Sequence, residues 1–170
     1  MLRTMLARAA LGALLSSAVV GTAEAKEPSV AIGAKRGDGM GNSPGVDVAF
    51  PLVQNLYLGM AAYALLDAEG RGLALAPALQ WRMYRTLEGP VPYLSGGVNA
   101  QVRRYGSRTA TGTGVFATVG IEWLFGFGIS LRGGLGVQVQ QAVQVEDGPV
   151  TIEQPGYVSL FMDGGVRYWF

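Results

Sequence analysis

The sequence predicts an all-β fold, an eight-stranded antiparallel up-and-down transmembrane β-barrel that is apolar outside and polar inside. Three observations predict it. Apolar residues alternate with polar or small residues along eight segments, several of them about ten residues long, the length a tilted strand needs to cross a bilayer. Only 15% of the 170 residues are charged, whereas soluble domains average about 25%. The 26 glycines leave space where strands close tightly around a filled lumen.

The beginning of the chain has the pattern of a cleavable signal peptide. A basic region with Arg3 and Arg8 precedes an apolar stretch, and Ala23 and Ala25 occupy the two positions that a signal peptidase recognises. The apolar stretch is shorter than the ~20 residues of a membrane-spanning helix, which disfavours the alternative of an uncleaved anchor. We therefore expect a signal peptide over residues 1–25, cleavage after Ala25, and a single barrel domain over residues 26–170.

The composition excludes the commonest catalytic chemistry and zinc chemistry. The sequence has no histidine and no cysteine. It therefore cannot form a Ser-His-Asp relay, a disulfide, or a zinc site with imidazole or thiolate ligands. Removing two arginines and one glutamate with the signal peptide leaves 11 basic and 11 acidic residues of the original 13 and 12, so nucleic acid is not an expected partner. We expect no enzyme activity, no cofactor and no metal ion.

The first four predicted strands cover residues 29–35, 46–50, 56–66 and 73–84. Each has apolar side chains at every second position, the period of a strand with one apolar face. The uncharged stretch 48–66 is nearly long enough for a transmembrane helix. However, Pro51 and Asn55 interrupt it and are typical of a turn, and a lone helix would leave the other alternating segments unexplained.

The last four predicted strands cover residues 93–103, 115–125, 129–140 and 158–170, and their alternation is the clearest. The odd-numbered connections between the eight strands are mostly long, polar and glycine-rich, as in 36–44, 106–114 and 142–156. The even-numbered connections include the tightest turns, as in 51–55 and 125–127. Membrane barrels have this asymmetry, with short periplasmic turns and longer external loops.

Aromatic residues gather near the strand ends that meet the short turns. Such a ring suits a membrane interface, where aromatic side chains are favoured. The predicted aromatic girdle comprises Phe50, Trp81, Trp123, Phe125 and Phe127, with Tyr168 and Phe170 beside it.

The C-terminal residues from Asp163 to Phe170 resemble the assembly signal of bacterial outer-membrane barrels, with a polar residue, a glycine two positions later and alternating aromatics that end in Phe. The resemblance implies that the barrel assembly machinery recognises Gly165, Tyr168 and Phe170. With the signal peptide and eight strands, the chain resembles the small OmpA- or OmpX-type barrels. This implies a monomer in the bacterial outer membrane, surrounded by lipid and lipopolysaccharide. Lipid-modifying enzymes share this architecture but use a catalytic histidine, which is absent here.

Five bases and three acids fall on the predicted inward-facing positions. They are Lys35, Asp47, Arg82, Arg103, Glu122, Arg132, Asp163 and Arg167. Unpaired charges in a tight lumen are costly, so we expect them to pair or to hold water. If the hairpin turn centres on Gly126, Glu122 faces Ser130 and Gly120 faces Arg132. This register predicts an ion pair between Glu122 and Arg132, with Gly120 leaving space for the guanidinium.

The predicted function is a structural or surface-interaction role for an outer-membrane barrel whose lumen is filled by these charges. The alternative is a narrow pore that weakly prefers anions, because bases outnumber acids in the lumen. A further alternative is a soluble periplasmic lipocalin-like barrel that binds a ligand, although its outside should then be rich in charge. Some arginines near the predicted external rim are candidate contacts for lipopolysaccharide phosphates. They are Arg36, Arg71, Arg104 and Arg108.

Overall fold

The computed structural model describes residues 28–170 except 38–40, 67–69, 85–87 and 148, so the predicted signal peptide lies outside the described residues. This part of the chain forms ten strands. They are β1 (Ser29–Gly37), β2 (Gly41–Val53), β3 (Leu56–Leu66), β4 (Arg71–Arg82), β5 (Gly89–Tyr105), β6 (Arg108–Leu124), β7 (Ile129–Gln140), β8 (Val143–Asp147), β9 (Val150–Gln154) and β10 (Tyr157–Trp169).

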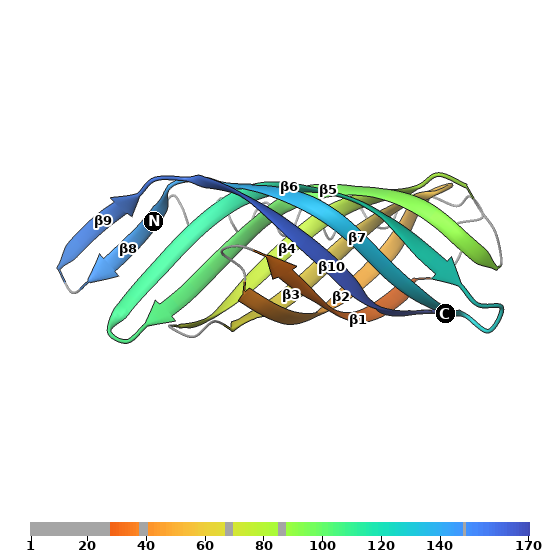
Figure 1. Ribbon diagram of the computed structural model, residues 1–170, viewed down its shortest axis with the longest axis horizontal. Coiled ribbons are helices and arrows are strands. Elements are labelled where there is room, and N and C mark those ends of the chain that lie inside the picture. The colour runs from red at the N-terminus through yellow and green to blue at the C-terminus, as the bar shows by residue number, and fades with distance from the viewer. Residues whose placement is uncertain (1–27, 38–40, 67–69, 85–87, 148) are drawn as a thin grey trace.

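Eight of these strands, β1 to β7 and β10, form a closed antiparallel barrel (Figure 1). Each strand from β1 to β6 pairs with the next one along the chain, and β10 pairs with β7. The first and last strands close the cylinder, because Ser29 lies opposite Trp169 and Gly37 lies opposite Phe161. The predicted eight-stranded up-and-down barrel is therefore confirmed.

The apolar face of the strands points outward. On β5, Leu94 and Val98 are each about half exposed, whereas the alternate residues Tyr93 and Gln101 are buried. The same alternation recurs around the barrel, with Leu131 and other aliphatic side chains on the outer surface. The lipocalin-like alternative is wrong, because such a barrel would turn these apolar residues inward.

Two predicted loops are largely strand. β5 and β6 are 17 residues each and continue to a turn at Gly106 and Ser107, where Gly106 has a φ of 61°. The predicted loop 106–114 is therefore wrong. The alternation did not reveal this part of β6, because its outward positions include Thr109 and Thr111 rather than aliphatic side chains. Similarly, β2 is 13 residues long and occupies much of the predicted loop 36–44.

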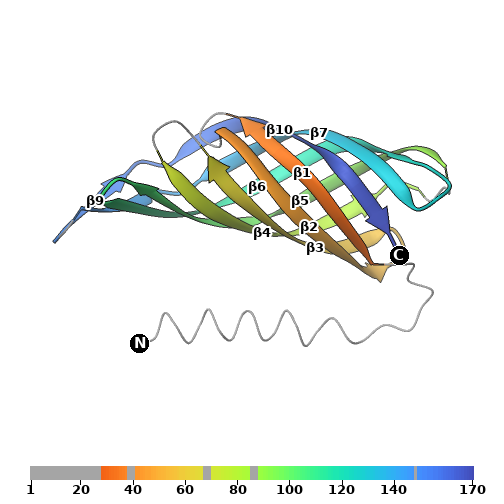
Figure 2. The same cartoon turned by 90° about the horizontal axis from the view of Figure 1, so that it is seen from below.

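The predicted loop 142–156 contains the hairpin β8–β9. β8 pairs with the outer part of β6, where Val145 lies opposite Ala110, and β9 pairs with β8. The hairpin and the β5–β6 turn lie at the end of the barrel opposite the C-terminus (Figures 1 and 2). We call this end the outer mouth; the other end, with the β2–β3 and β6–β7 turns, is the turn end.

No helix in the described part of the chain is long and apolar enough to span a membrane. Residues 48–66, the helical alternative, form the end of β2, a turn and β3. Asn55 in this turn has a φ of 65°, a conformation that asparagine tolerates better than most residues.

Candidate functional site

Charged and aromatic side chains lie in successive layers along the inside of the barrel. Because alternate residues of every strand point inward, each layer collects one or two side chains from several strands. The layer nearest the turn end contains Glu122, whose carboxylate accepts hydrogen bonds from Arg82 and from the Ser130 hydroxyl. The ion pair between Arg82 and Glu122 is 2.8 Å long, and the Glu122 side chain is fully buried.

Aromatic rings cover this ion pair on the side of the turn end. The Arg82 guanidinium lies 4.1 Å from the ring centroid of Trp169, a cation–π geometry. Trp169 packs edge-on against Tyr57 with centroids 5.3 Å apart, and its indole N–H donates to Ser130. Trp169 is thus the inward-facing member of the C-terminal aromatic run.

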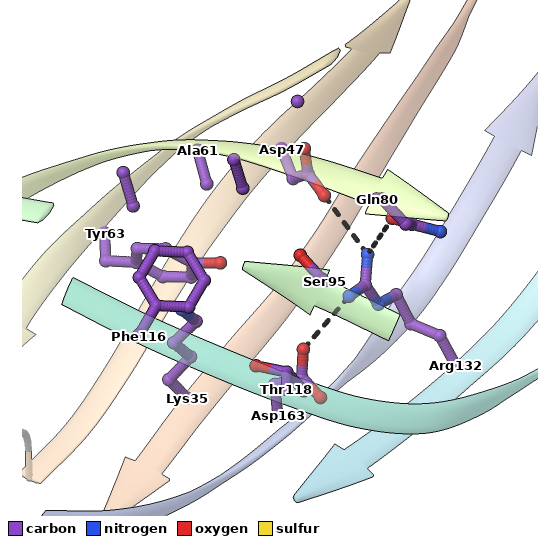
Figure 3. Close-up of a pocket in the computed structure, with 13 residues that line it drawn as sticks. Lys35, Asp47, Ala61, Tyr63, Gln80, Ser95, Phe116, Thr118, Arg132 and Asp163 are labelled. Carbon is purple, nitrogen blue, oxygen red and sulfur yellow. Dashed lines mark hydrogen bonds and ion pairs between the residues drawn. The ribbon is translucent and has the colours of Figure 1, made fainter. Parts of the chain in front are cut away.

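A second charged layer lies further from the turn end. Arg132 binds the carboxylates of Asp47 at 3.2 Å and Asp163 at 3.0 Å (Figure 3). Arg167 also binds Asp47, and the Gln80 carbonyl oxygen accepts hydrogen bonds from both arginines. The three arginines and three carboxylates of the two layers balance in charge. We call these six residues the charge network; they are Asp47, Arg82, Glu122, Arg132, Asp163 and Arg167.

The predicted ion pair between Glu122 and Arg132 is wrong in register and in partners. Glu122 lies directly opposite Arg132, not opposite Ser130, because the turn includes Gly128 at a φ of 83° and centres slightly later than Gly126. Glu122 instead reaches across the lumen to Arg82. Sequence reasoning could assign these residues to the inner face, but it could not find partners on strands distant in the chain.

Glycines leave space for Tyr93, a lumen residue that the sequence analysis missed. A Cβ at Gly120 or at Gly134 would lie 2.6 Å from the Tyr93 hydroxyl oxygen. This hydroxyl donates to Asp163 at 3.1 Å, and Arg132 lies over the ring at 4.7 Å. Gly120 was predicted to leave space for the arginine, whereas the space holds the tyrosine. The sequence did carry a signal for this residue, because Tyr93 falls on the inward face of its strand and an inward-facing glycine, Gly120, lies opposite it on β6.

Beyond the charge network, Lys35 lies in a ring of aromatic side chains. Its Nζ is 4.2 Å from the ring centroid of Phe116, 4.7 Å from that of Phe161 and 4.8 Å from that of Tyr63. We call these three rings the aromatic collar. Lys35 itself is buried at this level of the lumen.

Two small voids lie near the charge network and the collar, between described residues. One cavity of about 30 Å³ lies beside Lys35, Asp47 and Asp163 (Figure 3), and another of about 20 Å³ lies behind Gly33 and Gly165. Such volumes hold about one water molecule each. Among the described residues, no three acidic side chains come together as a metal site.

The remaining predicted residues lie on the outer surface or at the mouth. Phe50, Trp81, Trp123 and Phe127 are exposed near the turn end, and Phe125 is half-buried. Tyr168 and Phe170 are also exposed there, while Gly165 lies opposite Gly33 at the strand closure. Arg36, Arg71, Arg104 and Arg108 are exposed toward the outer mouth, and Arg103 is buried within it.

A closed antiparallel barrel of eight strands, apolar outside and charged within, defines the fold of the small outer-membrane barrels. The structure is similar to the N-terminal β-barrel domain of Pseudomonas aeruginosa OprF, with a TM-score of 0.65 and 15% identity over 86% of this chain and 98% of that chain. It is also similar to Neisserial surface protein A, with a TM-score of 0.55 and 16% identity over 85% of this chain and 95% of that chain. No protein-family model and no curated protein sequence matches the chain.

Proposed function

We propose that the protein is an integral outer-membrane barrel with a structural or surface-interaction role and a lumen closed by side chains. The observation that supports the proposal is that the charge network and then the aromatic collar around Lys35 occupy two successive levels of the lumen. No step of catalysis is part of the proposal, because the sequence contains no histidine or cysteine.

The packing of the lumen favours a structural role over conduction. An open water path needs continuous empty space along the barrel axis. The two voids near the charge network hold only about one water molecule each. Buried charges that satisfy one another are costly to separate, because each would lose its partner without regaining bulk water. The charge network is therefore expected to stay closed under ordinary conditions.

Planar-bilayer recording tests the closed lumen directly. Purified protein should insert without a steady unit conductance. The variants Glu122→Gln and Arg132→Gln should likewise show none. A steady unit conductance in the unmodified protein that changes in these variants would overturn the proposal. Inserted protein is verified in the same preparation by its compact migration on an unboiled gel.

The narrow anion-preferring pore remains the second candidate, for one reason. Bases outnumber acids among the predicted inward-facing residues, because Lys35 and Arg103 lie toward the outer mouth in addition to the balanced charge network. Such a lumen would favour anions if the collar opened. Reversal-potential measurements in a salt gradient give the selectivity of any conductance that is observed.

The proposal extends to lipopolysaccharide as a partner. Arg71 and Arg104 lie directly opposite each other on β4 and β5, and both are exposed. Like charges at opposed positions repel, whereas a phosphate between them would accept hydrogen bonds from both guanidinium groups. The double variant Arg71→Gln, Arg104→Gln should bind lipopolysaccharide-containing vesicles more weakly than the unmodified protein does, with no difference on phospholipid vesicles. Equal binding of the two proteins to lipopolysaccharide would contradict this assignment.

A further inference from the structure

A cavity of about 390 Å³ opens at the outer mouth, between the ends of β5 and β6 and the hairpin β8–β9. This volume falls within the range of small-molecule sites, whereas the voids deeper in the lumen do not. We call it the mouth pocket. Its polar lining residues are Gln101, Arg103, Tyr105, Arg108, Gln154 and Tyr157.

The walls of the mouth pocket are held by regular structure. β8 pairs with the outer part of β6, which places Val145 of the hairpin opposite Ala110, and both side chains are buried. β5 and β6 are paired without interruption up to Tyr105 and Arg108. The described lining residues of the pocket therefore all lie on strands.

The lining chemistry favours an anion that also carries hydroxyl groups. Arg103 and Arg108 come from neighbouring strands, and none of the described lining residues is acidic. Arginine is suited to phosphate and carboxylate, because its planar fork donates two parallel hydrogen bonds. Around the two arginines, amide and phenol groups such as Gln101, Gln154 and Tyr157 can donate to hydroxyl oxygens and accept from hydroxyl groups.

One of the two arginines already binds a carboxylate in this structure. Arg108 forms an ion pair with Asp147 at 2.8 Å, but the two side chains are 59% and 36% exposed. Exposed ion pairs contribute little to stability, so the Arg108 guanidinium can turn to a bound anion at small cost. Arg103 is buried beside it, and its Nη1 donates to the Tyr105 hydroxyl at 3.4 Å.

The pocket is closed on its inner side. Gln138 and Gln140 are buried below it and are hydrogen-bonded to each other, and the aromatic collar lies deeper still. A solute that enters from outside would therefore be held at the mouth rather than passed through the barrel.

We propose that the mouth pocket binds a small phosphorylated sugar, with the phosphate held by Arg103 and Arg108. The sugar hydroxyls lie against the tyrosine and glutamine side chains. This site is separate from the charge network, so it exists whether or not the lumen conducts. The phosphorylated sugar can be a free solute or part of a lipopolysaccharide headgroup, since the two share this chemistry.

Isothermal titration of the refolded full-length protein in lipopolysaccharide-free detergent micelles tests the site, with glucose 6-phosphate as the probe. We expect saturable binding of one molecule per barrel, and no binding of glucose at the same concentrations. Arg108→Gln should weaken the affinity by about ten- to a hundredfold, the effect of losing a charge-assisted hydrogen bond. Arg103→Gln should do the same.

The control is Gln144→Ala, because Gln144 is exposed on β8 between the lining residues Val143 and Val145 but does not line the pocket itself. It should bind glucose 6-phosphate as the unmodified protein does. If Arg103→Gln fails to fold, shown by the loss of compact migration on a gel, the exposed residue Arg108 carries the test alone. Equal weakening in Gln144→Ala, equal binding of glucose, or no saturable binding at millimolar concentrations would each overturn the proposal.

Added lipopolysaccharide distinguishes the two sources of the sugar phosphate. If it displaces glucose 6-phosphate from the unmodified protein, the pocket accepts the lipid-borne group. If glucose 6-phosphate stays bound, the site is specific for free solutes. Both results support a phosphosugar site, provided that Arg108→Gln weakens glucose 6-phosphate binding.

Discussion

The Glu122 carboxylate has no contact with solvent, and Arg82 is its ion-pair partner at 2.8 Å. Replacing Glu122 by Gln keeps the shape but removes the negative charge, which leaves the buried Arg82 without compensation. We expect Glu122→Gln to lower the free energy of unfolding by about 3–5 kcal/mol, the usual effect of breaking a buried pair. Denaturant unfolding in detergent measures the shift in midpoint.

Asp147→Asn is the control for this variant. It removes the carboxylate of an ion pair with Arg108 that is largely exposed at the outer mouth, where such pairs contribute about 0–1 kcal/mol. An equal midpoint for Glu122→Gln and the unmodified protein would show that the buried pair does not stabilise the barrel.

Gly134 tests the space around Tyr93. A Cβ at this position would lie 2.6 Å from both the Tyr93 hydroxyl oxygen and an Asp163 carboxylate oxygen. Gly134→Ala should therefore destabilise the barrel by about 1–3 kcal/mol, as overpacking does. Gly133→Ala is the neighbouring control, because a Cβ there has no heavy atom within 4 Å. A similar loss of stability in both variants would point to backbone effects instead of crowding in the lumen.

The inward direction of single residues could be predicted from the sequence, but their contacts could not. A period of two assigns Glu122 and Arg132 to the same face. Whether they bind each other depends on the turn, since a shift in its centre changes which residues oppose one another. It also depends on Arg82 and Asp47, which reach them across the lumen from β4 and β2.

At the scale of elements, the alternation of apolar residues reveals a strand only where one face meets an apolar environment. For this reason the alternation predicts the eight barrel strands. The predicted strand ends differ most from the structure toward the outer mouth. Beyond the apolar belt, the outward positions of β6 hold threonines, and the pattern disappears although the strand continues. The hairpin β8–β9 alternates weakly on both sides of Pro149, a residue typical of turns. Because eight strands had already been assigned, this segment was predicted as part of a loop.

The hairpin β8–β9 should be dispensable for the barrel. It adds to the outer part of β6 only, whereas β7 and β10 pair with each other without it. A variant in which a short Gly-Ser linker replaces residues 143–154 should still migrate as a compact species before boiling and as an extended one after boiling. It should lose binding of glucose 6-phosphate, because the hairpin forms a wall of the mouth pocket. Failure to form the compact species would show that the hairpin takes part in folding.

The C-terminal strand has a separate predicted role in assembly. Phe170 is exposed at the turn end and packs against Tyr168, so its replacement removes few contacts inside the barrel. Phe170→Ala should lower the amount of protein in the outer membrane of expressing cells, while the purified chain refolds in detergent as before. Leu160→Ala, an exposed residue near the other end of β10, is the control. Equal cellular amounts of both variants would argue against a role for Phe170 in assembly.

At the scale of the whole molecule, charges of both signs occur near both ends of the barrel. The charge network, with three bases and three acids, lies toward the turn end. The outer mouth combines exposed arginines such as Arg104 and Arg108 with Asp147 and Glu153 of the hairpin β8–β9. The near-zero net charge expected for residues 26–170 therefore does not arise from two ends of opposite charge.

The closure of the barrel between β1 and β10 has one more consequence. Ser29 lies opposite Trp169 at the same rim, so the ring of strand neighbours has no privileged starting point. A circular permutant that joins these ends by a short linker and begins at Ser107 would preserve every pairing of the wall. We expect it to refold in detergent with compact migration on a gel. This result would show that the barrel forms from its strand pairings whichever strand comes first in the chain.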